Sequence, residues 1–184
     1  MYIWIGLLLN EDCEKKIRDV CKDINKKYLV NEQSFTLPQH ISLKTSFFSN
    51  EYKKIIEFIS DLYDNEEKTS LIVQNITMLS NKVIWLDMLE TDQLREMHNF
   101  LNKELNSKFN IPLSGFDGEK FQFHSTLFQE LIENKKIVSL YNELKEKMKF
   151  PFNIEIDRVC IGLSEIGKVG TYRVIKEIKL KQKH

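Results

Sequence analysis

Apolar side chains recur along this chain with two periods, which predict strands and helices in a regular order. Residues 2–9 are continuously apolar, as in a buried strand. Residues 13–28 then carry apolar side chains at helical spacing, and Asn10 is the expected N-cap of that helix. The same spacing predicts helices over 55–63, 94–105 and 137–148, of which the first two begin after the expected caps Asn50 and Thr91.

The strands predicted between these helices lie at 39–44, 70–79, 83–89, 121–128, 152–162 and 171–180, with a tight hairpin turn at 80–82. The resulting order is β-α-β-α-β-β and then α-β-α-β-β, so the second half repeats the first without its opening strand. We therefore predict an α+β fold with two duplicated β-α-β-α-β-β halves, related by a pseudo-two-fold axis around a central cleft. Residues 1–184 would form a single bilobal domain with lobes of roughly 1–90 and 91–184, and strands could be exchanged between the lobes.

Two short phrases, at 40–43 and 124–127, both read His, any residue, hydroxyl residue, Leu. Each falls within a predicted strand, where residues two apart project from the same face. His40 therefore projects with Ser42, and His124 with Thr126. Because the two phrases occupy matching places in the duplicated halves, we expect both pairs to face one cleft.

The paired phrases suit the opening of a 2′,3′-cyclic phosphodiester. That reaction needs a base to activate water, an acid to protonate the departing ribose oxygen, and donors to the phosphate oxygens. Histidine suits the first two roles because its ordinary pKa lies near 6.5. The hydroxyls of Ser42 and Thr126 suit the third role. This chemistry requires neither a metal nor another cofactor.

Other polar residues near the phrases are weaker candidates. Lys44 shares a face with His40 and Ser42 and is a candidate phosphate or strand-backbone contact, or else a solvated lysine at the sheet edge. His98 lies on the inner side of its predicted helix and is expected to be packed. His184 is the last residue and is not expected to belong to the site.

Composition narrows the class of partner. Lys+Arg and Asp+Glu both number 27, so the chain has no formal net charge, which argues against general duplex binding. A small nucleotide or an RNA 3′ end remains compatible with it. The three cysteines have no Cys-x-x-Cys spacing and are expected to be reduced thiols, and the apolar start is too short to span a membrane. We expect a cytoplasmic monomer with no membrane partner.

The paired phrases resemble those of the 2H phosphoesterase superfamily, also called the 2′-5′ RNA ligase-like family, and the element order resembles it across nearly the whole chain. The family has a bilobal α/β fold with a central cleft and includes RNA 2′,3′-cyclic phosphodiesterases. The resemblance implies that His40 and His124 are the acid and base, and that Ser42 and Thr126 hold phosphate oxygens. Residues 37–47 also look like the first motif of a Bacillus-type branch.

The chain departs from the bacterial RNA ligase-like branch at two places. That branch tends to carry Arg where this chain has Gln129, and Pro where it has Phe123. The resemblance also implies that ligands stack on aromatic side chains and meet basic groups near the cleft. Candidates of these types are Phe48, Phe128, Arg158, Tyr172 and Arg173.

The leading hypothesis is a metal-independent phosphodiesterase that acts on 2′,3′-cyclic phosphate RNA ends or small cyclic nucleotides. The same site could serve as a 2′-5′ oligonucleotide phosphodiesterase or, in the reverse direction, as an RNA ligase. A third possibility is a module that binds RNA or nucleotides without catalysis. The sequence does not assign the acid and the base between the two histidines.

Overall fold

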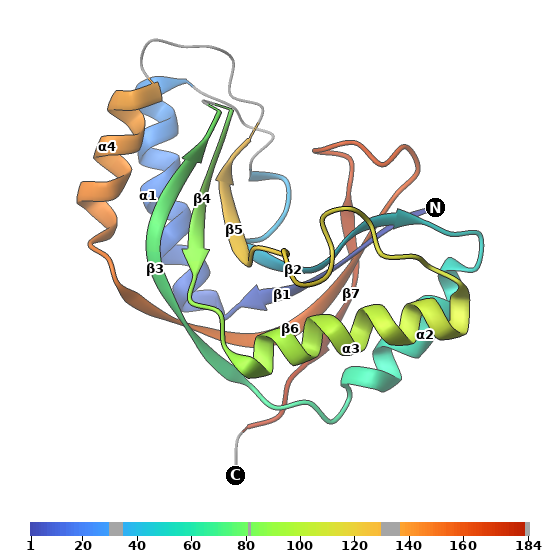
Figure 1. The fold of residues 1–184 in the computed structure, drawn as a ribbon. Coiled ribbons are helices and arrows are strands. Elements are labelled where there is room, and N and C mark those ends of the chain that lie inside the picture. Colours follow the sequence, from blue (N-terminus) through green and yellow to red (C-terminus); the bar gives the residue numbers. More distant parts are fainter. Residues whose placement is uncertain (30–34, 81, 130–136, 183–184) are drawn as a thin grey trace.

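The structure is a computed structural model that describes residues 1–29, 35–80, 82–129 and 137–182. Strands and helices follow one another in the predicted mixed order, so the α+β prediction is confirmed (Figure 1). In chain order they are β1 Tyr2–Leu9, α1 Glu11–Tyr28, β2 His40–Phe48, α2 Tyr52–Tyr63, β3 Thr69–Leu79, β4 Val83–Met88, α3 Asp92–Phe109, β5 His124–Phe128, α4 Ile137–Met148, β6 Phe152–Ser164 and β7 Arg173–Lys179.

Two of the three predicted helix caps are confirmed. The side chain of Asn10 accepts a hydrogen bond from the backbone N–H of Cys13, and Thr91 does the same for Leu94. The prediction for Asn50 is wrong. Glu51 occupies the N-cap position of α2 without a side-chain cap, and its own N–H donates to the hydroxyl of Ser49.

The strands form one antiparallel sheet in the order β2-β1-β6-β3-β4-β5. The long strand β6 lies in the middle of this order. One of its edges pairs with β1, and the other pairs with β3 along 152–156 and with β7 along 158–163. Strands from both halves of the chain therefore share one sheet, and the division into lobes of 1–90 and 91–184 stays a prediction.

The two strands that carry the histidine phrases lie at opposite ends of the sheet order. Nevertheless β2 and β5 contact each other, so the sheet curves until its two ends meet. Helices α1 and α4 pack together beside β3, whereas α3 packs on β2 and α2 on β7 (Figure 1). The curvature brings together two segments that are far apart in the sequence.

A continuous apolar core fills the space between the sheet and the helices. It takes Ile3, Ile5 and Leu7 from β1, and Ile41 and Leu43 from β2. In β2 these residues alternate with His40 and Ser42, which therefore lie on the opposite face of the sheet, whereas the alternate positions of β1 include Trp4 and Leu8 of a second, smaller buried cluster. All three cysteines are free thiols, as expected, and no helix among the described residues is long and apolar enough to cross a membrane.

Candidate active site

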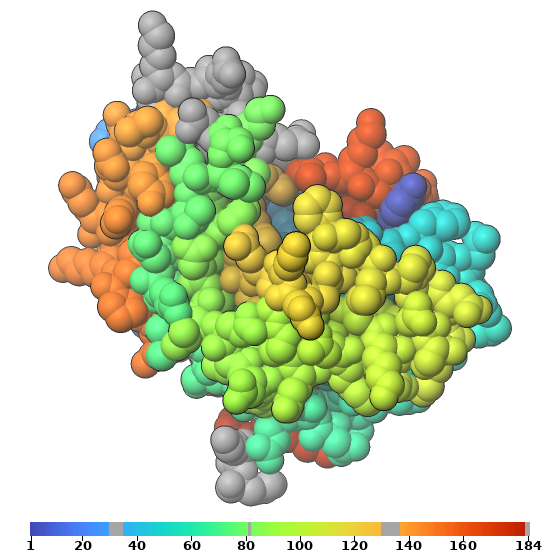
Figure 2. All heavy atoms as spheres, viewed as in Figure 1, coloured from blue at the N-terminus to red at the C-terminus, as the bar shows by residue number. Residues whose placement is uncertain are grey.

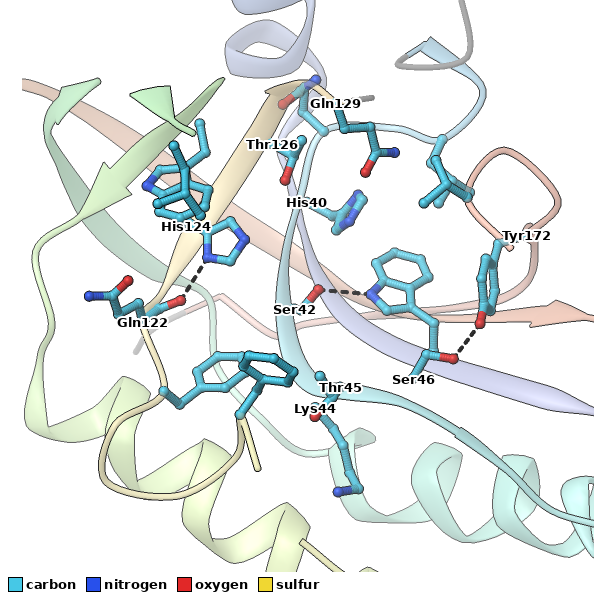
Figure 3. A pocket seen from close by; sticks show the side chains of 18 of the residues that line it. His40, Ser42, Lys44, Thr45, Ser46, Gln122, His124, Thr126, Gln129 and Tyr172 are labelled. Carbon is cyan, nitrogen blue, oxygen red and sulfur yellow. Dashed lines mark hydrogen bonds between the residues drawn. The ribbon is translucent and has the colours of Figure 1, made fainter. Parts of the chain in front are cut away.

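Both histidines stand at the first position of their strand and bond in the same way. The Nδ1 atom of His40 lies 2.7 Å from the carbonyl oxygen of Pro38. That of His124 lies 2.7 Å from the carbonyl oxygen of Gln122, as Figure 3 shows. A carbonyl only accepts hydrogen bonds, so each Nδ1 must donate. The Nε2 atom of each ring is left to take or give a proton in the cleft that both rings line.

The two strands also share a β-bulge at the Leu of the phrase. Ser42 is opposite Gly6 and Lys44 is opposite Ile5, so Leu43 is the extra residue in β2. In β5 the extra residue is Leu127, because Thr126 is opposite Trp85 and Phe128 is opposite Ile84. A bulge ends the simple alternation of faces. The histidine and the hydroxyl face the cleft, but the Leu and the residue after it are both buried.

The bulge overturns the prediction for Lys44. Its side chain is 1% exposed, and its Nζ atom lies 2.7 Å from Asp117 Oδ2 and donates to Asn102 Oδ1. Figure 3 shows this ammonium pointing away from the two histidines. Lys44 is therefore neither a phosphate contact nor a solvated edge lysine, because its charge is neutralised inside the protein.

Of three other substrate-contact candidates, Phe128 is excluded by its burial, and the roles of Arg158 and Arg173 stay predictions. Phe128 is fully buried and packs edge-to-face on Phe35, since the bulge turns it inward. Arg173 is exposed on β7 and is not among the described residues that line the cleft. Arg158 pairs with Asp157 and Glu177.

The two remaining aromatic candidates have different positions. Phe48 is exposed at the end of β2 and packs on Tyr2, outside the described lining of the cleft. Tyr172 lines the cleft, and its hydroxyl is paired with the hydroxyl of Ser46 (Figure 3). Partial burial raises the pKa of Tyr172. Its role as a substrate contact stays a prediction.

His98 is packed, as expected. It is fully buried, its ring stacks on Phe121, and its Nδ1 atom donates to the carbonyl oxygen of Leu43. Burial lowers the pKa of His98. The other expected non-participant, His184, lies outside the described residues.

Each catalytic histidine candidate has a tryptophan on the neighbouring strand, which sequence reasoning missed. The Trp4 ring lies 4.2 Å from the His40 ring, and its Nε1 donates to Ser42 Oγ at 3.0 Å. Since this oxygen already accepts one bond, the hydroxyl proton of Ser42 is left for a ligand. A Cβ atom at Gly6 or Gly162 would lie within 2.7 Å of the indole, so glycine at both positions lets Trp4 lie against the sheet.

The second tryptophan, Trp85, donates its indole N–H to a carboxylate and not to a hydroxyl. The Trp85 ring lies 4.5 Å from the His124 ring at an interplanar angle of 32°. Its Nε1 donates to Asp87 Oδ1, and Thr77 donates to Asp87 Oδ2, both at 2.6 Å. Asp87 is directly opposite His124 in the sheet. This places a fixed carboxylate beside the second histidine.

A buried hydrogen bond ties the two histidine strands together. Ser125 Oγ donates to Gln39 Oε1 at 2.9 Å, and both side chains are almost fully buried. Gln39 immediately precedes His40, and Ser125 immediately follows His124, so this hydrogen bond joins the two strands directly beside the histidines. The sequence signal for it was a lone hydroxyl on the otherwise apolar face of 121–127.

Burial has unequal effects on the two imidazoles. It lowers the pKa of His40 to about 4, and the charge of His124 acts in the same direction, while the Pro38 carbonyl and the charge of Glu14 only partly oppose this change. Burial also lowers the pKa of His124, but here both the Gln122 carbonyl and the charge of Asp87 oppose it. Neutral imidazole is therefore favoured at both positions, and more strongly at His40.

The cleft between these strands has a volume of about 660 Å³, within the range of small-ligand sites. It opens on the molecular surface beside the loop that precedes β5, drawn in yellow in Figure 2. Besides the histidines and hydroxyls it is lined by aromatic and amide side chains, including Trp4, Trp85, Gln122 and Gln129. No group of three or more His, Cys, Asp or Glu side chains in the described part of the chain is arranged to hold a metal ion.

The chain is similar to one known family and to several solved structures. The sequence model of the 2′-5′ RNA ligase superfamily matches residues 15–165, more than half of the chain. Among solved structures, TT0787 of Thermus thermophilus is 14% identical over 100% of both chains, with a TM-score of 0.68. LigT of E. coli in its apo form is 15% identical over 98% of both chains, with a TM-score of 0.60. A comparison with curated proteins gave no match.

LigT has also been solved in complex with 3′-AMP, with 15% identity to this chain, 98% coverage of both chains and a TM-score of 0.59. At such identities these similarities show that the fold is shared. The three structures cover 98–100% of this chain.

Proposed function

This chain belongs to the 2′-5′ RNA ligase superfamily and is therefore an enzyme of the phosphoesterase class, and we propose that it is a metal-independent phosphodiesterase. Its substrates are RNA ends or small nucleotides that carry a 2′,3′-cyclic phosphate. The observation that carries this proposal is the pair of His-x-hydroxyl phrases brought into one cleft by the two ends of a curved sheet. The complex of LigT with 3′-AMP supports a nucleotide as the ligand.

The roles follow from the proton transfers of the reaction. One neutral imidazole accepts a proton from water through Nε2, and the water oxygen forms a bond to phosphorus. The bond from phosphorus to one ribose oxygen breaks, and the second imidazole, protonated, gives its proton to that oxygen. Each proton transfer contributes about 10²- to 10⁴-fold to the rate. His40 and His124 fill these two roles.

The hydroxyls act on the charge that builds up during the reaction. Ser42 and Thr126 face the same cleft as the imidazoles, one on each strand. As the water attacks, negative charge grows on the non-bridging oxygens of the phosphate, and fixed donors stabilise it. The Trp4 bond holds the Ser42 hydroxyl in place before the substrate arrives.

The test measures hydrolysis of a nucleoside 2′,3′-cyclic phosphate in the presence of EDTA. We expect the wild-type protein to be active and His40→Asn and His124→Asn each to lose about 10²- to 10⁴-fold in kcat. Thermal unfolding of each variant provides the control for folding. Full activity in either variant would contradict the assignment, and loss of wild-type activity in EDTA would contradict the metal-free mechanism.

Product analysis separates the alternatives. A 2′- or 3′-phosphate end supports cyclic phosphodiesterase activity, whereas mononucleotides released from a 2′-5′ linked oligomer support the oligonucleotide phosphodiesterase. Saturable binding with no turnover on either substrate would leave only a binding module. In that case the asparagine variants would bind as tightly as the wild type.

A further inference from the structure

The buried imidazole of His98 joins two segments that form walls of the cleft. Its Nδ1 atom donates to the carbonyl oxygen of Leu43 in β2 at 2.7 Å, and its Nε2 atom accepts the backbone N–H of Gly118 at 3.0 Å. Gly118 belongs to the loop at 110–123, which we name the Phe116 loop after its exposed ring. Figure 1 shows this loop returning from the end of α3 past β2 to β5.

On the side of β2, the bond from His98 reaches the bulge of the first histidine phrase. Leu43 is the extra residue of this bulge and directly follows Ser42. The extra residue of a bulge has no residue opposite it on the neighbouring strand, and the ladder is locally disrupted there. The bond from α3 therefore fixes the backbone at the point from which His40 and Ser42 face the cleft.

On the side of the loop, His98 supports the residues that lead into the second histidine phrase. Its ring stacks on the ring of Phe121, with the centroids 4.3 Å apart, and Phe121 lines the cleft. The next residue, Gln122, supplies the carbonyl oxygen that binds Nδ1 of His124. The bond to Gly118 and the stack on Phe121 thus act on the short segment that orients the second imidazole.

The Phe116 loop has further attachments on both sides of His98. Asp117 Oδ2 lies 2.7 Å from Lys44 Nζ, and Asp117 Oδ1 accepts the backbone N–H of Thr45 at 3.1 Å. The guanidinium of Arg95 donates to two carbonyl oxygens of the loop at 2.7 and 2.8 Å. Because these bonds remain when His98 is changed, we expect such a change to shift the loop and not to unfold it.

The two bonds of His98 require a neutral ring with its proton on Nδ1. A protonated ring would turn the new Nε2–H towards the loop N–H, so that two donors would face each other. Burial lowers the pKa of His98, and the charges of Arg95 and Lys44 act in the same direction, while the carbonyl bonded to Nδ1 and the charge of Asp117 oppose them. Arg95 is itself paired with Glu90. The neutral ring that the bonds need is therefore the favoured form.

We propose that His98 is a positioning residue for the reaction, which sets the separation and direction of the two catalytic imidazoles through its bonds to both walls of the cleft. His98 is not among the described residues that line the cleft, so it acts through the backbone of β2 and of the loop. A displacement of about 1 Å between reacting groups costs about 10²-fold in rate. The inference rests on the proposed phosphodiesterase function and adds a third histidine to its requirements.

The test uses three variants that separate the two bonds. His98→Asn keeps an amide N–H at the place of Nδ1 but loses the acceptor for Gly118, whereas His98→Gln places an amide oxygen near the position of Nε2 but loses the donor to Leu43. His98→Phe keeps a ring to stack on Phe121 and makes neither bond. The matched control is Leu105→Ala, which opens a cavity beside the same helix and removes neither bond.

The kinetics are measured with a nucleoside 2′,3′-cyclic phosphate, below the thermal unfolding transition of each variant. We expect His98→Phe to lower kcat about 10- to 10²-fold and to change KM little, because it displaces the reacting groups and leaves the binding contacts in place. His98→Asn and His98→Gln should each have a kcat between those of the wild type and His98→Phe, because each keeps one bond. Leu105→Ala should lose stability but keep the wild-type kcat.

Three outcomes would overturn the inference. They are a wild-type kcat in folded His98→Phe, a loss confined to KM, and a loss of kcat in Leu105→Ala equal to that in His98→Phe. The last result would make His98 a purely structural residue of α3. If His98→Phe does not fold, the asparagine and glutamine variants decide, and a wild-type kcat in both would also overturn the inference. Failure of the proposed function is a separate result, in which the wild-type protein does not hydrolyse the cyclic phosphate.

Discussion

The strands β2 and β5 have the same bulge and the same pattern of buried positions, but they carry different residues at the fifth position. In both, the first and third residues face the cleft and the second, fourth and fifth are buried. The fifth residue is Lys44 in β2 and Phe128 in β5. A lysine is expected at a surface and a phenylalanine in a core, yet the bulge buries both. The comparison teaches that the register with the neighbouring strand, and not the residue type, decides which way this position points.

The polar partners of the two strands also differ. The indole N–H of Trp4 holds the hydroxyl of Ser42, whereas the indole N–H of Trp85 holds the carboxylate of Asp87 opposite His124. The fold thus repeats the geometry that the reaction needs, while it gives the two imidazoles different surroundings. Two groups that exchange protons with one substrate benefit from such a difference, because one must be neutral while the other is protonated.

The largest effect is expected at the fifth position of each strand. Asp117→Ala should lower the free energy of unfolding by about 3–5 kcal/mol, because it leaves the buried ammonium of Lys44 without its counter-charge. Phe128→Ala should lower it by about 3–5 kcal/mol by opening a cavity. Urea unfolding measures both. The double variant Lys44→Met/Asp117→Asn should recover part of the loss, because it buries no charge.

A smaller loss of unfolding free energy in Asp117→Ala, below about 1 kcal/mol, would mean that Lys44 reaches solvent.

The ion pair between Lys44 and Asp117 also predicts that the stability of the fold depends on pH. Burial by itself raises the pKa of Asp117, but hydrogen bonds from Lys44 and Thr45 outweigh burial and lower this pKa to about 2. A lowered carboxyl pKa stabilises the fold above its ordinary value of 3.8, and this contribution is lost as the pH falls from there towards 2.

The next effect concerns the hydroxyls at the third position. Ser42→Ala and Thr126→Ala should each lower kcat by about 10²- to 10³-fold, because each removes one donor to the charge on the phosphate. Steady-state kinetics on a nucleoside 2′,3′-cyclic phosphate measures this. Ser42→Thr keeps the donor and should retain most of the activity. If only one of the two alanine variants lost activity, the strands would not be functionally equivalent.

A moderate effect is expected from the bond that joins the strands. Gln39→Ala and Ser125→Ala should each lower kcat by about tenfold, since either change loosens the spacing of the two imidazoles. The double variant should lose no more than the worse single variant, because both changes remove the same bond. Additive losses would show that the two side chains act independently.

The smallest effect is a change of pH dependence without a loss of maximal rate. Asp87→Asn keeps acceptor and donor groups for Trp85 and Thr77 but removes the negative charge that raises the pKa of His124. The pKa of His124 should therefore fall, and the part of the pH–rate profile that it controls should move to lower pH. NMR titration of the imidazole C–H signals measures the shift directly. The pKa of His40 should shift far less than that of His124. Equal shifts of the two pKa values would contradict the different surroundings inferred for the two imidazoles.

Local patterns in the sequence were sufficient for the elements and for the motif. Asn10 and Thr91 cap their helices through bonds that span only three residues, so the signal and its partner lie in one short segment. The projection of His40 with Ser42, and of His124 with Thr126, follows from the two-residue period of a strand. The helix at 52–63 shows the limit of such reasoning, because its N-cap position is Glu51, one residue after the expected Asn50.

The sequence by itself therefore determined the order of strands and helices and the residues able to move protons, because periodicity and capping are properties of neighbouring residues. Only the tertiary structure decided that Lys44 and Phe128 turn inward, that Gln39 bonds to Ser125 and that Asp117 fixes the Phe116 loop. Each of these depends on a partner from another part of the chain. Such partners are set when the sheet closes, and the pattern within either segment does not contain them.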